Sequence, residues 1–118
     1  MPDFKERDLP ESTHFHDPVV SIHVEFKFTE GFKVDSAQTL TALVRDLKIV
    51  HNGEIIKSNL QPIWLRSRPN FLLFPIEQPN GIHLPADARV RISVAQNVPH
   101  LITVLPSFWT KQRIWANL

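Results

Sequence analysis

Strict alternation of apolar and polar residues marks the clearest element of the chain, VVSIHVEFKF at residues 19–28. This period of two predicts a strand with one buried face and one solvent-facing face. The predicted inward residues are Val20, Ile22, Val24, Phe26 and Phe28, and the predicted outward residues are Ser21, His23, Glu25 and Lys27. Residues 88–94 alternate in the same way, with Val90, Ile92 and Val94 inward and Arg89, Arg91 and Ser93 outward.

A hairpin is predicted over residues 48–57, which read KIVHNGEIIK. Asn52 and Gly53 suit the two positive φ angles of a type I′ turn, and this turn would pair Val50 with Ile55 and Ile49 with Ile56. Because both faces of such a hairpin would be apolar, we expect it to be covered on both sides.

Three shorter apolar runs, bounded by turn residues, predict further strands. They are PIWLRS at 62–67, NFLLFPI at 70–76 and HLITVLP at 100–106. The segment 34–50 is ambiguous: Leu40, Leu43, Val44 and Leu47 form a stripe at helical spacing, whereas Leu40, Ala42 and Val44 alternate as in a strand. We favour a short helix at 36–46, with the strand as the alternative.

Together these elements predict a mainly β fold: a small antiparallel β-sandwich or barrel with room for one short helix. The ten prolines of the chain agree with short strands joined by turns. The expected organisation is an N-terminal arm at 1–17 that lacks hydrophobic periodicity, a β-rich domain at 18–106, and an aromatic and basic C-terminal tail at 107–118.

Composition narrows the class of protein. The 118 residues suit one domain, and the absence of cysteine excludes disulfides and thiolate metal sites. The first residues lack the apolar core of a signal peptide, and no apolar run is long enough for a membrane span, so we expect a cytoplasmic protein without a membrane partner. Three glycines and the absence of Gly-x-Ser-x-Gly argue against phosphate-cradling loops and serine hydrolases. No cofactor is therefore expected, apart from a divalent metal in the alternative that follows.

The stretch HFHDP at 14–18 raises the question of a metal site. In an extended chain, His14 and His16 would point to the same side, about 7 Å apart, and two imidazoles at that distance can share one ion. Further ligands would come from His23, Glu25, His83 and His100. The corresponding function is a small metal-dependent β-barrel enzyme, against the simpler interpretation of a solvated polar arm.

Basic residues two apart define a second candidate site, for an anion or single-stranded nucleic acid. The candidate binding residues are Arg66, Arg68, Arg89, Arg91, Trp109, Lys111, Arg113 and Trp115. Cations on strand faces can neutralise phosphates while tryptophans stack on bases. Arginines on the wet face of a sheet are also ordinary, and thirteen basic against twelve acidic residues give no general basic excess.

The function favoured by the sequence is a non-enzymatic binding or assembly module that acts through protein–protein contacts and associates with itself. The two unusual termini motivate this hypothesis, because such arms can exchange between copies or extend a neighbour's sheet. Its partner is a second copy or another protein.

Overall fold

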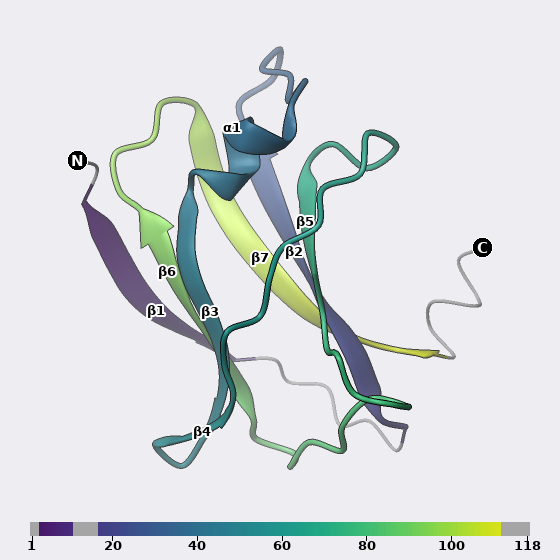
Figure 1. The fold of residues 1–118 in the computed structure, drawn as a ribbon. Helices are drawn as coiled ribbons and strands as arrows, with labels where there is room; N and C mark the ends of the chain where they lie inside the picture. Colours follow the sequence, from purple (N-terminus) through teal and green to yellow (C-terminus); the bar gives the residue numbers. More distant parts are fainter. Residues whose placement is uncertain (1–2, 11–16, 112–118) are drawn as a thin grey trace.

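The computed structural model describes residues 3–10 and 17–111, which form two antiparallel sheets packed as an open sandwich (Figure 1). One sheet has the order β1-β6-β3-β4 and the other has the order β5-β2-β7. The strands are β1 (Phe4–Pro10), β2 (Val19–Phe28), β3 (Val44–His51), β4 (Glu54–Lys57), β5 (Phe71–Pro75), β6 (Arg89–Ala95) and β7 (Leu101–Thr110), and the helix is α1 (Ala37–Thr41). The predicted fold class is confirmed as a sandwich and not as a closed barrel.

Alternation decides which side chains form the core between the sheets. Most of the predicted inward residues of β2 and β6 are buried, with Phe26, Val90 and Ile92 fully covered, whereas Phe28 at the end of β2 is half-buried. Phe74 from β5 and Phe108 from β7 complete the aromatic part of this core. Burying one such side chain stabilises the fold by about 1.5–3 kcal/mol, so this layer is the main source of stability.

The first residues of β2 depart from simple alternation. The pairing of β2 with β7 shifts register between Val19 and Ser21. Val19 therefore enters the core, with 1% of its surface exposed, whereas Val20, the predicted core residue, is only half-buried. A bulge of this kind reverses the face assignment of one residue without ending the strand.

The helix predicted at 36–46 exists but is shorter. It ends at Thr41, and Val44 already pairs with Val94 of β6. Leu40 is fully buried from the helix and Leu47 from β3, so these two of the four residues of the predicted stripe reach the core from different elements. Pairing with β6 outweighs helical spacing here because it provides ladder hydrogen bonds along a β-branched segment.

The turn of the predicted hairpin is confirmed, but the expectation that the hairpin is covered on both sides is wrong. Asn52 and Gly53 have φ of 50° and 80°, and Val50 pairs with Ile55. A register shift then pairs Ile49 with Lys57 instead of Ile56. Strand β4 is an edge strand, and Ile55 and Ile56 remain 53% and 38% exposed, so neither is covered.

The strand predicted at 62–67 is also wrong. Only Ile63 pairs, through one bridge to Leu73 of β5, and the chain then turns. Trp64 donates a hydrogen bond from Nε1 to the Pro69 carbonyl (2.9 Å), and the Arg68 N–H bonds to the Leu65 carbonyl (3.0 Å). These bonds close a loop in place of a second strand.

Both termini of the described chain contribute strands. Within the expected arm at 1–17, residues 4–10 form β1, which pairs with β6 over seven residues. Within the expected tail at 107–118, the residues up to Thr110 belong to β7 and pair with β2. The β-rich unit therefore uses residues from all three expected segments.

The fold requires glycine at position 81, where there is no room for a side chain. Its φ is +79°, and a Cβ there would lie 2.4 Å from the Val19 carbonyl oxygen. Gly53 has nearly the same φ, +80°, but open space around it.

We expect Gly81→Ala to lower the free energy of unfolding by about 1–2 kcal/mol for the left-handed backbone and by a further 1–3 kcal/mol for the clash. Gly53→Ala should show the backbone cost alone. Urea denaturation of both variants measures the difference, and equal losses would contradict a close approach of Gly81 to β2.

Candidate functional site

The outer face of the β5-β2-β7 sheet holds a cluster around His23. The sequence places His23 on a solvent-facing strand surface, and this expectation is wrong: only 3% of the residue is exposed. The Trp109 ring stacks on the imidazole with centroids 4.1 Å apart and an angle of 10° between the planes. Trp109 lies opposite Ser21 on the neighbouring strand, at the next position of the same sheet face as His23. From this diagonal position a large aromatic ring can reach over the histidine.

Arg68 completes the cover of His23 from the loop before β5. Its Nη1 donates a hydrogen bond to His23 Nδ1 at 3.1 Å. The guanidinium also lies over Phe71 at 4.1 Å and near Trp109 at 5.4 Å from the ring centroids. A planar cation between two aromatic rings is held by electrostatic attraction to both π faces.

These contacts assign the protons of His23. Because a guanidinium only donates, Nδ1 must be the acceptor, and the ring proton is then on Nε2. Nε2 lies 3.0 Å from Ser21 Oγ and donates to it. The histidine is thus a neutral, fully oriented ring in the centre of the sheet face.

Ser107 links Trp109 to the same network. Trp109 Nε1 donates to Ser107 Oγ at 2.9 Å, and Ser107 Oγ donates to the His23 carbonyl at 3.4 Å. The indole therefore has a fixed orientation as well as a stacking partner. The arrangement immobilises polar groups on the outer face of this sheet.

Apolar residues surround this cluster on the same face of the sheet. Leu73 lies opposite His23 on β5, Leu105 and Phe71 lie on either side of Glu25, and Ile63 bridges to Leu73. Leu105 is 43% exposed and Ile63 is 46% exposed. We call Ile63, Arg68, Phe71, Leu73, Leu105 and Trp109 the β2 outer face.

Among the predicted binding residues that the structure describes, Arg68 and Trp109 come together from separate elements, the loop before β5 and strand β7. Arg66 is exposed in the loop, with its guanidinium 5.8 Å from the Trp64 ring centroid. Lys111 follows β7 and donates from Nζ to Asn80 Oδ1 at 2.9 Å. The spacing of two residues therefore does not place Arg66 and Arg68 on one strand face.

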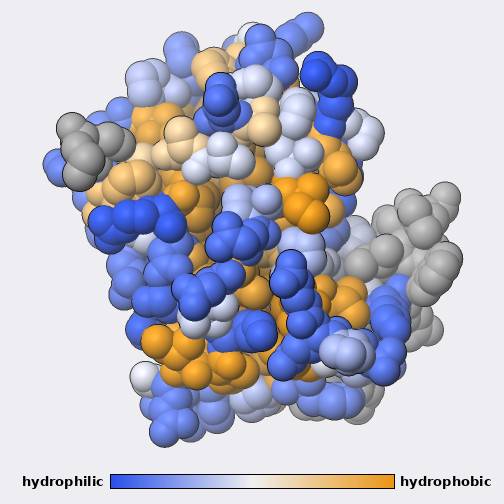
Figure 2. All heavy atoms as spheres, in the orientation of Figure 1, coloured by the Kyte–Doolittle hydropathy of each residue, from blue (hydrophilic) through white to orange (hydrophobic). Residues whose placement is uncertain are grey.

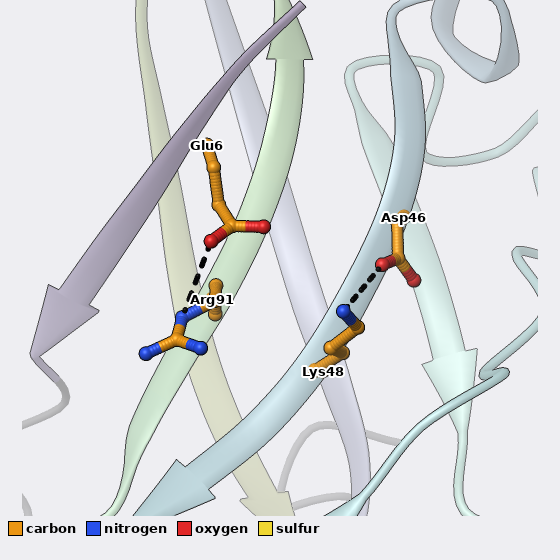
Figure 3. A network of polar contacts seen from close by, with 4 residues as sticks. All are labelled: Glu6, Asp46, Lys48 and Arg91. Atoms are coloured by element: carbon orange, nitrogen blue, oxygen red, sulfur yellow. Dashed lines mark ion pairs between the residues drawn. The ribbon is translucent and has the colours of Figure 1, made fainter. Parts of the chain in front are cut away.

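Arg89 and Arg91 lie on the other sheet. Figure 3 shows the Arg91 side chain beside Glu6 of β1, with Nε 3.6 Å from the carboxylate, and Lys48 beside Asp46 on β3 at 3.2 Å. Two acidic and two basic side chains balance each other in this group. Figure 2 shows hydrophilic residues across this face and hydrophobic colour in several separate places, one of them at the lower left, over β4.

The remaining candidates lie outside the described residues: Arg113 and Trp115 of the tail, and the proposed metal ligands His14 and His16. In the described ranges, 3–10 and 17–111, no three His, Asp or Glu side chains are grouped closely enough to hold a metal ion. The proposed further ligands His23 and His100 make other contacts, His23 with Arg68 and His100 with Thr29.

The sequence did not identify His23, Ser21, Ser107 and Phe71 as parts of one cluster. The signal was present in part, since Ser21 and His23 were assigned to one strand face together. What was missing was the strand order, because only the positions of β5 and β7 beside β2 bring Phe71 and Ser107 to that face.

We expect Arg68→Met to lower the free energy of unfolding by about 1–3 kcal/mol, because it removes the hydrogen bond that Arg68 donates to the buried His23 Nδ1 and the cation between Phe71 and Trp109. Arg66→Met is the matched control in the same loop and should cost less than about 0.5 kcal/mol. Urea denaturation followed by tryptophan fluorescence measures both, and equal effects would contradict the assigned role of Arg68.

Comparison with known protein families, with curated proteins and with solved structures found no match to this chain. In the part of the chain that the structure describes, no helix has the length and apolar character needed to cross a membrane.

Proposed function

We propose that this chain is a non-enzymatic assembly module that associates with a second copy of itself through the β2 outer face. The observation that carries the proposal is the exposure of large apolar side chains on that face, with Leu105 and Ile63 each more than two-fifths exposed. Solvent-facing strands usually carry polar residues, and contiguous apolar surface is typical of an interaction site.

The composition of the face favours a second copy as the partner. A two-fold axis brings the same patch of two chains together, so a suitable patch must complement itself. Apolar side chains meet this condition without further design. The charged residues of the face also meet it, since half-buried Glu25 lies near exposed Lys27 on the same side of β2, which lets opposite charges pair across the axis.

Rigid aromatic and arginine side chains strengthen this choice. Trp109 and Arg68 belong to the residue types that dominate binding energy in protein interfaces. Their mutual contacts hold them in position before any partner arrives, with Trp109 fixed on His23 and Arg68 fixed on Phe71. A preorganised surface loses less side-chain entropy on association.

Self-association is assigned to the sheet face, and not to the edge of β7 that faces away from β2, because Pro106 interrupts that edge. The Ile76 N–H bonds to the Val20 carbonyl, so the even-numbered residues of β2 direct their backbone groups to β5 and the odd-numbered ones to β7. Pro106 lies opposite Val24, an even-numbered residue, and its nitrogen therefore points away from β2, to that edge. Proline offers no donor there, which opposes the addition of a strand.

Leu105→Arg tests the face directly. We expect the wild-type chain to form dimers and the variant to dimerise at least tenfold more weakly, because a charge would be buried at the centre of the interface. Ile55→Arg is the matched control: Ile55 is 53% exposed, but lies on β4 of the other sheet. Sedimentation velocity over a range of concentrations measures the dimer fraction.

Circular dichroism should show that both variants keep the β fold. A wild-type chain that stays monomeric at all concentrations would contradict the proposal. Equal weakening by Ile55→Arg would move the interface to the other sheet, and would contradict it as well.

A further inference from the structure

A cavity of about 270 Å³ opens at the side of the sandwich, where β1 of one sheet and β7 of the other contribute to the same lining. The β1 wall carries Lys5 and Arg7, and the β7 wall carries Ile102 and Val104. The floor includes Val94 of β6, which is 1% exposed, and the connection after β6 adds Gln96 and Asn97. None of the six residues defined as the β2 outer face lines this cavity.

The β1 wall is cationic. Lys5 pairs with Val94 and Arg7 pairs with Ile92, so both side chains are on the inward side of an edge strand, toward the cavity. Among the described residues, neither side chain forms an ion pair, and the residues that line the cavity include no Asp or Glu. Lys5 and Arg7 are both exposed, and these two like charges share one wall of a lining that contains no carboxylate.

The β7 wall is apolar and partly uncovered. Ile102 is 65% exposed, more than any other large hydrophobic residue in the described ranges. Leu101 and Val98, which also line the cavity, are half-buried. An exposed isoleucine opposite two cations matches a small molecule with an anionic group at one end and an apolar group at the other.

Inward-pointing charges on an edge strand also protect it against pairing with other sheets, and this role suits Lys5 and Arg7. Edge protection does not require an apolar wall opposite the charges, nor a cavity between them. We therefore propose that the cavity is a binding site for a short-chain aliphatic carboxylate. The carboxylate pairs with Arg7 and Lys5, and the alkyl chain lies against Ile102.

Titration of the whole chain with acetate, butyrate and hexanoate, followed by NMR chemical shifts, tests this site. Affinity should rise by about three- to fourfold for each added methylene as the tail covers the β7 wall. It should fall with added salt, because the head group is held by cations. Hexanol, which lacks the charge, and inorganic phosphate, which lacks the tail, should each bind more weakly than hexanoate.

Two pairs of variants locate the site. Arg7→Gln should weaken hexanoate binding by about tenfold through loss of a charged hydrogen bond, while Lys33→Gln, an exposed lysine outside the cavity lining, should leave it unchanged. Ile102→Thr should flatten the dependence on chain length, while Ile55→Thr on β4 should preserve it.

Shifts centred on Val94 and Ile102 are the expected signature. Absence of saturable binding would overturn the proposal and leave the cations with edge protection alone. Affinity that ignores chain length, or shifts centred on Trp109 and Leu73 instead, would overturn it too. None of these three results depends on dimer formation, so this test is separate from the test of the proposed self-association.

Discussion

The stack of Trp109 on His23 is the contact on which the outer surface of this protein depends. Strand β2 is the centre of a three-stranded sheet, and its inner face is covered by the opposite sheet. Its outer face has no such layer among the described residues, yet a histidine there is almost fully buried. Side chains from a neighbouring strand and from a loop supply the cover instead, and they produce a rigid surface with apolar borders.

Alternation was sufficient to predict a small antiparallel sandwich or barrel, because the inward residues of β2 and β6 show which faces are buried, but it did not decide between the two. It failed to predict burial where a polar side chain is covered by its neighbours or an apolar side chain is left uncovered. His23 is polar and lies on the outward side, as predicted, but the Trp109 ring and Arg68 exclude water from it. Ile55 is apolar and yet exposed, because β4 is at the edge of its sheet. The burial of a side chain depends on where its strand lies within the sheet as well as on the alternation along that strand.

The candidate basic site shows a related limit. Residues two apart share a face only if both belong to one strand. Arg66 and Arg68 both lie in the loop that follows Ile63, where Arg66 contacts Trp64 and Arg68 contacts His23. Arg89 and Arg91 do lie together on β6, but in the other sheet, where Glu6 contacts Arg91. Strand order is a non-local property, and local spacing carries little information about it. The sequence could therefore indicate cations on strands without indicating which of them are neighbours.

Strand β7 connects the two surfaces that we assign to binding. On this strand Leu105 and Trp109 belong to the β2 outer face and Val104 and Phe108 are buried on the inward side, while Ile102 and Val104 line the cavity. A shift of one residue in its pairing with β2 would exchange the two sets. Phe108 prevents this shift, because it pairs with Ile22 in the core and is 2% exposed. The register that stabilises the sandwich is thus also what keeps the apolar contact face and the cationic cavity apart, and a mutation in the core beneath β7 would disturb both surfaces together.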